Sequence, residues 1–215
     1  MVRQDRAERT RNTILDAAAE VFDERGFAGA SLSEILTKAG VTKGALYFHF
    51  SSKEELAMAL IEEQWKADLP FVDFDNVSLQ TVIDICHGFA HNIRTNVRVR
   101  ASNRLVLEAN FSRPAPEVYQ RWISILQDIL EHAQTRGDLR KEWDPALVAD
   151  WVSATFLGIQ SQSEVFTGMA DIHERITVLW RIAIPGLVPP RRVSRFQPAG
   201  TAQWDAATEA ATASA

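Results

Sequence analysis

The chain has 215 residues, of which 46% are hydrophobic and 24% are charged, and its formal net charge is −5. A chain of this length forms one large or two small domains around a substantial core. The single Cys86 excludes an intramolecular disulfide, and the sequence contains neither a signal-like apolar region nor 18 uninterrupted apolar residues. We therefore expect a soluble, cytoplasmic protein with no membrane partner.

The first 30 residues predict an amphipathic helix. Apolar residues recur there at helical spacing, namely Ile14, Ala18, Val21 and Phe22. Asp5 and Glu8 are spaced to cap the start of this helix, and Gly26 is placed to end it.

Residues 31–56 predict two short helices joined by a glycine turn. Ser31 and Glu34 have the spacing of a capping box, and Gly40 suits the positive φ that ends a helix near Ala39. Thr42 is placed to cap a second helix of barely two turns. Its apolar residues Val41, Leu46 and Phe50 are expected to face inward. This pattern predicts a helix-turn-helix.

The outer face of the second short helix suits DNA. Lys43 can reach guanine O6 and N7, and Thr42 can touch a phosphate or a thymine methyl. Gly44 and Ala45 let the backbone approach the floor of the major groove. The other predicted contacts are Ser33 and the phosphate anchors Tyr47, His49 and Lys53. Each of these anchors taken singly is equally compatible with an ordinary surface residue.

The charge distribution limits how such a protein binds DNA. Residues 1–53 carry eight Lys or Arg against seven Asp or Glu, whereas residues 54–215 carry 15 against 21. Without a broad basic surface, affinity must come from a few placed contacts and from dimerisation. The N-terminal arm with Arg3 and Arg6 is predicted to follow a phosphate strand or enter the minor groove. The alternative is a frayed, solvated terminus.

Every long segment beyond the helix-turn-helix is predicted to be helical. The expected ranges are 52–67, 78–99, 101–110, 116–136, 144–166 and 171–184, with boundaries at Pro, Gly and capping residues. We predict an all-α protein of about nine helices with three parts. These are a DNA-binding domain at 1–52, an effector-binding and dimerisation domain at 53–188, and a mostly disordered tail at 189–215.

The second domain is predicted to hold a small molecule. The helices at 78–99 and 116–136 have broad apolar faces that can wrap a cavity, and such cavities carry a few polar groups that orient the ligand. The predicted lining residues are Trp122, Gln64, Phe89, Tyr119, Leu126 and Gln160. For any one of them, a place in a closed core is an equally good interpretation.

Two segments resemble the tetracycline-repressor family: RNTILDAAAEVFDERG at 11–26 and GVTKGALYFHFSSKEEL at 40–56. The sequence TKGALYFHF at 42–50, together with the N-terminal segment RQDRA at 3–7, is most similar to the γ-butyrolactone autoregulator receptors. The resemblance implies a repressor of secondary metabolism that binds a pseudo-palindromic operator as a homodimer and is released by a lactone. It also implies that Trp122, which follows the proline-rich 113–116, lines the effector pocket, with Gln64 as a second contact.

In the resembled family the last two long helices form the dimer interface. Here they offer close-packing and apolar positions that we expect at that interface: Trp151, Thr155, Gly158, Ile159, Ile176 and Trp180. An intramolecular bundle is the alternative interpretation of these helices.

Other functions fit less well. His87 and His91, with Asp84 one turn earlier, have metal-ligand spacing, but no further motif completes a metal site or an enzyme's active site. We expect no enzyme activity, cofactor or metal. A nucleoid-type protein would need a basic surface throughout. A drug- or antibiotic-sensing repressor of the same fold is the nearest alternative.

Overall fold

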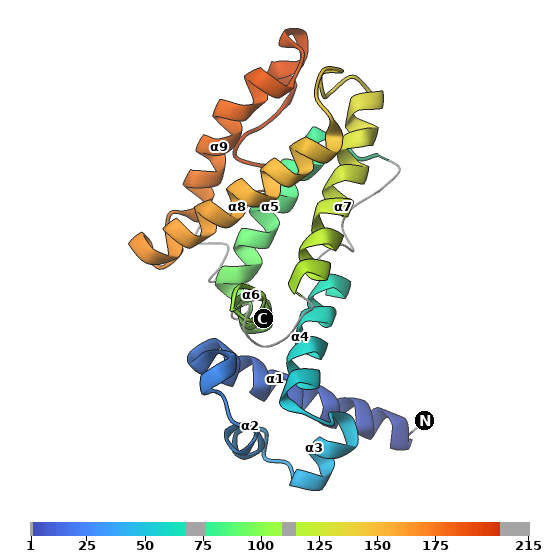
Figure 1. Ribbon diagram of the computed structural model, residues 1–215, viewed down its shortest axis with the longest axis vertical. Coiled ribbons are helices and arrows are strands. Elements are labelled where there is room, and N and C mark those ends of the chain that lie inside the picture. Colours follow the sequence, from blue (N-terminus) through green and yellow to red (C-terminus); the bar gives the residue numbers. More distant parts are fainter. Residues whose placement is uncertain (1, 68–75, 109–114, 203–215) are drawn as a thin grey trace. The chain divides into compact units, whose positions relative to one another are not determined.

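The computed structural model describes residues 2–67, 76–108 and 115–202. These residues form nine α-helices, one short 3-10 helix and no strand, which confirms the all-α prediction. The bounds are α1 Val2–Gly29, α2 Leu32–Ala39, α3 Lys43–His49, α4 Lys53–Ala67, α5 Leu79–Thr95, α6 Val97–Leu107, α7 Ala115–Thr135, α8 Pro145–Thr167, α9 Ile172–Leu187 and η1 Pro190–Arg195 (Figure 1). No helix in the described ranges is long and apolar enough to cross a membrane.

The chain divides into two compact units, and it passes between them three times. Unit 1 comprises 1–70 and 96–116, and unit 2 comprises 71–95 and 117–215. The predicted division between residues 52 and 53 does not coincide with these units. The reason is packing: α4 contacts α1, and α6 contacts both α1 and α4, so both helices share the core of the first three.

The first helix begins earlier than predicted and is interrupted, but not ended, at the predicted glycine. α1 starts at Val2, so Arg3 and Arg6 lie within a helix rather than in the extended arm that the sequence suggested. Asp5 therefore lies within the helix rather than at its start. Gly26 has φ 67° and ψ 178°, which interrupts the helix at the predicted glycine and leaves one more turn up to Gly29.

The helix expected at 78–99 is divided in two. Asn96 has extended backbone angles, and its side chain accepts hydrogen bonds from the N–H groups of Arg98 and Val99. This N-cap starts α6 at Val97, four residues before the predicted start at Ala101. The break at Asn96 coincides with a boundary between the two units, because α5 belongs to unit 2 and α6 to unit 1.

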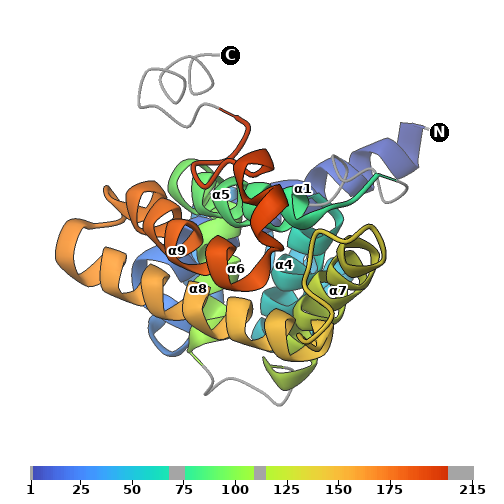
Figure 2. The same cartoon turned by 90° about the horizontal axis from the view of Figure 1, so that it is seen from above.

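The core of unit 2 lies where α5, α8 and α9 meet. α9 packs against both α5 and α8, and Figure 2 shows α8 and α9 side by side. The buried face of α9 includes Ile172, Ile176, Leu179, Trp180 and Ala183. Fully buried residues of α5, such as Leu79 and Ile83, contribute to the same core.

The tail predicted to be disordered is ordered over its first part. Phe196 is buried, and the backbone of Gln197 exchanges two hydrogen bonds with the side chain of Gln80, at 2.8 and 3.2 Å. The N–H and hydroxyl of Thr201 donate to the two carboxylate oxygens of Asp84 at 2.8 and 2.9 Å. Residues 189–202 therefore pack on α5, and the prediction was wrong for them; residues 203–215 lie outside the described ranges.

Candidate nucleic-acid interface and ligand site

The helix-turn-helix has the local geometry that its sequence predicts. Ser31 and Glu34 form a reciprocal capping box at the start of α2, and Gly40 ends α2 with φ 63° and ψ 28°. The hydroxyl of Thr42 accepts a hydrogen bond from the N–H of Ala45 at 3.2 Å. The turn between α2 and α3 is therefore fixed by side chains that the sequence itself supplies.

Inward and outward residues of α3 separate clearly. Leu46 and Phe50 are 0% and 2% exposed and anchor α3 to the core of unit 1. The residues predicted to read DNA lie on the other side: Thr42, Lys43, Gly44 and Tyr47 are exposed, and Ala45 is half-buried. A Cβ added to Gly44 would meet no atom within 4 Å, so its backbone is open to close approach.

Lys43 lies at the first position of α3, with its Nζ 5.8 Å from the centre of the Tyr47 ring. The ring lies one turn further along, where it limits the positions that the ammonium group can take. The Lys43 ammonium group is thus confined to a limited region at the start of an exposed helix, which suits a hydrogen bond to the edge of a base.

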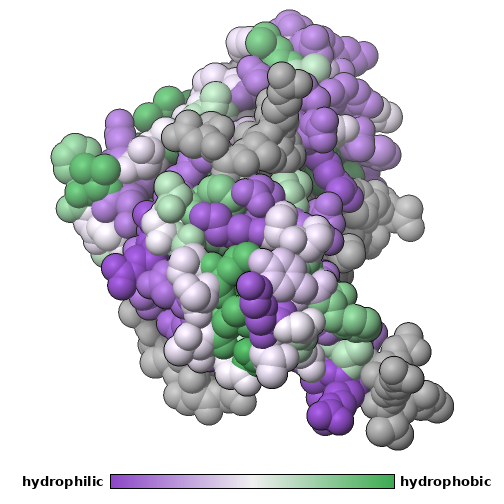
Figure 3. Space-filling view, turned by 60° about the horizontal axis from the view of Figure 1, so that its bottom comes forward, coloured by the Kyte–Doolittle hydropathy of each residue, from purple (hydrophilic) through white to green (hydrophobic). Residues whose placement is uncertain are grey.

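Phe48 is a residue of this face that the sequence interpretation missed. It is 78% exposed, more than any other large hydrophobic residue described. Its ring meets His49 edge-on with centroids 5.0 Å apart. The signal was available in the sequence, since Leu46 and Phe50 point inward and an aromatic residue between them must point outward. Figure 3, which brings the end of unit 1 with α2 and α3 forward, shows apolar and polar groups mixed on this surface.

His49 is half-buried, and its surroundings favour the neutral form of its imidazole. Burial, together with the positive charge of Arg11, lowers the pKa of its imidazole. Arg11 also lies over the Phe50 ring at 5.4 Å. His49 can therefore donate a hydrogen bond to a phosphate but adds no charge at neutral pH.

Lys53 has a structural role that the sequence did not predict. Its Nζ donates hydrogen bonds to the carbonyl oxygens of Phe27 at 2.7 Å and Ala30 at 2.9 Å. Two of its three N–H donors are thus used within unit 1, and its predicted contact with a phosphate stays a prediction. Its sequence position gave no sign of this, since both acceptors are more than 20 residues away.

The remaining predicted DNA contacts lie at the edges of this face. Ser33 is exposed in the first turn of α2, and its Oγ lies 3.0 Å from that of Ser31. Arg6 is exposed in the second turn of α1. The side chain of Arg3 lies outside the described residues, and its role stays a prediction.

Three aromatic residues in unit 2 come together from α5, α7 and α8. Phe89 lies 5.8 Å from Trp122 and 5.8 Å from Phe156, measured between ring centroids. Trp122 and Phe89 are half-buried, whereas Phe156 is buried. Trp122 and Phe89, predicted from separate helices, thus share one cluster, and Phe156 joins them although it was not among the predicted residues.

The other predicted ligand contacts differ in accessibility. Leu126 is fully buried, and Gln160 is 5% exposed. Tyr119 is half-buried, and burial raises the pKa of its phenol, which therefore stays protonated as a hydrogen-bond donor. The side chain of Gln64 lies outside the described residues. Contact of any of them with a ligand stays a prediction.

The predicted dimer residues fall into two groups. Ile176 and Trp180 are 0% exposed and belong to the core of their own protomer, so their assignment to the interface was wrong. Trp151 and Gly158 are exposed, and Thr155 and Ile159 are half-buried. These four remain candidates. Thr155 donates to the carbonyl oxygen of Trp151 at 2.7 Å.

The exposed apolar surface of α8 and α9 also includes residues that were not among the predicted interface positions. They are Leu147, Val165, Phe166, Val178 and Ile182, all at least 45% exposed. A groove of about 440 Å³ runs between the two helices, lined by Ile159, Asp171, Glu174, Arg175, Val178, Leu179 and Ile182. Exposed apolar groups collected on two neighbouring helices are typical of a protein interface.

Comparison with known proteins agrees with this arrangement. Residues 14–60 match the family of bacterial regulatory proteins called the tetR family. Over 202 residues the chain is 39% identical to the A-factor receptor protein of Streptomyces griseus, covering 93% of this chain and 71% of the relative.

Two solved structures share the fold over nearly their whole length. A gamma-butyrolactone receptor described as an ArpA-like protein is 35% identical with a TM-score of 0.75, covering 90% of this chain and 96% of that one. CprB of Streptomyces coelicolor, solved in complex with its operator, is 34% identical with a TM-score of 0.72, covering 88% and 94%. The chain belongs to the tetR family of bacterial regulatory proteins.

Proposed function

We propose that this protein is a transcriptional repressor that binds a pseudo-palindromic operator as a homodimer and is released by a small lipophilic effector. The observation that carries the proposal is the exposed face of α3, where Lys43, Gly44 and Tyr47 project from a helix anchored by the buried Leu46 and Phe50. An anchored helix whose first turn exposes small and polar groups is what the major groove admits.

The dimer is supported by the apolar groups on α8 and α9. A duplex with two-fold sequence symmetry is matched by a protein with two-fold symmetry, which presents two recognition helices about one helical turn apart. Val178 and Ile182 lie exposed beside the groove between the two helices and provide the apolar contact. No catalytic role is proposed for any residue, and the protein acts in the cytoplasm, where its DNA is found.

For the effector we propose the γ-butyrolactone class and, as its target, genes of secondary metabolism. The relatives named A-factor receptor and gamma-butyrolactone receptor support this choice. The half-buried Trp122 and Phe89 supply aromatic area for an acyl chain, and an indole N–H can donate to a lactone carbonyl. Such an effector can lower the operator affinity only by the difference between its own affinities for the DNA-bound and the free states of the protein.

The proposal is tested by selecting duplexes from a random library with the purified protein and then adding a synthetic 2-acyl-γ-butyrolactone to the complex. We expect a pseudo-palindromic consensus and loss of the complex on addition of the lactone. Release by an antibiotic panel but not by the lactone would assign the protein to the drug-sensing class. Failure to enrich any sequence would reject the repressor function itself.

A further inference from the structure

The bend near the end of α1 is held from two sides. Oε2 of Glu108, the residue that caps the end of α6, accepts a hydrogen bond from the N–H of Phe27 at 2.7 Å. Nζ of Lys53, the first residue of α4, donates to the carbonyl oxygens of Phe27 and Ala30 and lies 4.3 Å from the centre of the Phe27 ring. Both polar backbone groups of Phe27 are therefore bound by side chains from other helices.

The backbone at the bend explains why these side chains are needed. Gly26, at φ 67° and ψ 178°, is a non-helical residue inside α1, and the N–H of the next residue, Phe27, donates to the Glu108 carboxylate. A Cβ on Gly26 would collide with the Glu108 carboxylate. Glycine is thus required here both for its positive φ and for the close approach of Glu108.

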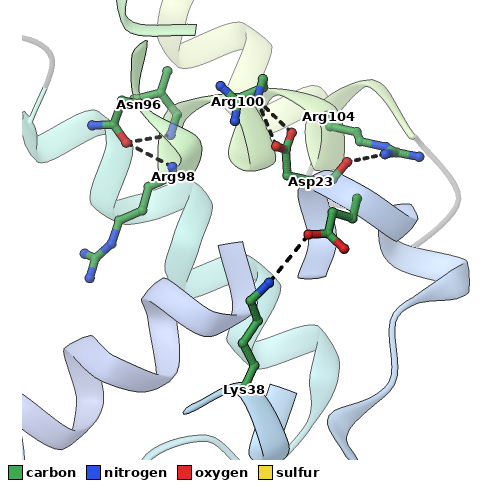
Figure 4. A network of polar contacts seen from close by, with 8 residues as sticks. Asp23, Lys38, Asn96, Arg98, Arg100 and Arg104 are labelled. Atoms are coloured by element: carbon green, nitrogen blue, oxygen red, sulfur yellow. Dashed lines mark hydrogen bonds and ion pairs between the residues drawn. The ribbon is translucent and has the colours of Figure 1, made fainter. Parts of the chain in front are cut away.

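Glu108 is itself held in place by α6. Nε of Arg104 donates to Oε1 of Glu108 at 2.7 Å, and the same guanidinium donates to the backbone carbonyl of Asp23. Nε of Arg100 bonds both carboxylate oxygens of Asp23, at 3.0 and 2.9 Å. Figure 4 shows Arg100 and Arg104 directed at Asp23 of α1. Charge-assisted bonds of this kind fasten α6 to α1 beside the bend.

The bend lies where both helices of the helix-turn-helix are attached. Ala30 directly precedes Ser31, the N-cap of α2. Lys53 starts α4 four residues after α3 ends at His49. A displacement of the Phe27 peptide therefore acts on the start of α2 and, through Lys53, on the end of α3.

We propose that Glu108 and Lys53 are positioning residues for operator recognition, which couple the end of α6 to α2 and α3 through the backbone of Phe27. Withdrawal of Glu108 frees the bend and lowers operator affinity. This inference rests on the proposed repressor function, since it states how a change in α6 reaches the recognition helix.

The first experiment measures affinity by fluorescence anisotropy for the pseudo-palindromic duplex that the wild-type protein selects. Glu108→Ala is expected to lower affinity about tenfold, because a hydrogen bond to a charged group is lost. Glu108→Gln keeps an acceptor and should restore most of the affinity. Arg98→Ala is the control: it removes contacts of α6 with Asp16 and Asn12, at 2.7 and 3.1 Å, away from the bend. Its effect should stay below about twofold.

A double variant tests whether the two residues act through one peptide. If both contacts are required to hold the bend, loss of the Lys53 contact alone already releases it. Glu108→Ala should then cost much less affinity in a Lys53→Ala background than in the wild type. If the fold-losses of operator affinity of the two single variants multiply in the double variant, the shared role is wrong. Equal losses of affinity for Glu108→Ala and Arg98→Ala would also overturn it.

Amide hydrogen exchange on the protein alone separates this inference from the repressor function. Glu108→Ala should accelerate exchange at residues 27–30 and in α3, whereas Arg98→Ala should not. Unchanged exchange at 27–30, or acceleration that stops there and leaves α3 unaffected, would overturn the coupling. A wild-type protein that selects no duplex would reject the proposed function, while the exchange result would still decide for or against the coupling.

Discussion

His87 of α5 and His173 of α9 meet with their Nδ1 atoms 3.0 Å apart and their rings stacked within 9° of parallel. Nε2 of His87 lies 3.0 Å from the carbonyl oxygen of Pro198. A carbonyl only accepts, so His87 carries its proton on Nε2 and, when neutral, accepts from His173 at Nδ1. The contact ties α5, α9 and the C-terminal segment together, and it requires that His87 is neutral, because protonation of its Nδ1 would place two N–H donors face to face.

Acid should therefore destabilise unit 2. Burial lowers the pKa of His87, and burial together with the charges of His87, Arg94 and His91 lowers the pKa of His173 from 6.5 to about 4. The Asp84 carboxylate, which opposes the shift of His87, does not cancel it. Because the unfolded chain binds more protons than the folded one, stability is complete above pH 6.5 and falls as the pH drops toward 4.

Urea unfolding between pH 7.5 and about 4.5 measures this dependence. His173→Asn removes the histidine whose pKa is lowered to about 4, so the free energy of unfolding of this variant should change less with pH than that of the wild type. Identical slopes for the two proteins would show that the pair does not cause the effect.

Lys43→Ala should weaken binding to the selected operator by about 1 to 3 kcal/mol and relax one base position, because a side chain at the start of α3 reads a base edge. Competition with operators that carry each base in turn measures the effect. An equal loss on every sequence would make Lys43 a phosphate contact instead.

Trp122→Ala should keep the dimer and the operator affinity but abolish the response to the lactone. The reason is that the half-buried indole offers contact area and one N–H donor in unit 2, whereas α3 lies in unit 1. If Trp122 were only part of the core, truncation would instead cost about 3 to 5 kcal/mol of folding stability. Melting temperature, operator affinity and lactone-induced release on one preparation distinguish these results.

Ile182→Asp should convert the dimer to monomers, since a carboxylate would be buried without a partner in an apolar interface. Ile182 is 75% exposed in the protomer, so the fold itself should tolerate the change. Sedimentation equilibrium gives the mass. Leu107→Asp, at a residue of unit 1 that is 43% exposed, is the matched control and should remain dimeric. A dimeric Ile182→Asp protein would place the interface elsewhere.

The helix-turn-helix was predictable because its determinants are local. Its helix ends are set by the capping box of Ser31 and Glu34, the positive φ of Gly40 and the cap at Thr42. Each of these acts within four residues along the chain, and the structure shows each at the position that the sequence predicted. The role of Lys53 was not predictable, because its partners Phe27 and Ala30 are brought near only by the tertiary fold.

Long-range pairing also determines which unit each helix joins. α6 belongs to unit 1 because Arg98 and Arg100 bind Asp16 and Asp23, partners more than 75 residues away in sequence. Helical periodicity identified an apolar face on α9. It could not distinguish Trp180, which faces its own core, from Ile182, which faces outward, because both are apolar and α9 has apolar residues on more than one side.

Two copies of α3 in one dimer are proposed to read one symmetric duplex. The most direct measurement is the mass of the complex with the selected duplex, by sedimentation or native mass spectrometry, combined with footprinting of both strands. We expect an even number of chains per duplex, with two protected half-sites centred about one helical turn, roughly 34 Å, apart. A single chain per duplex, or protection without defined half-sites, would contradict the account.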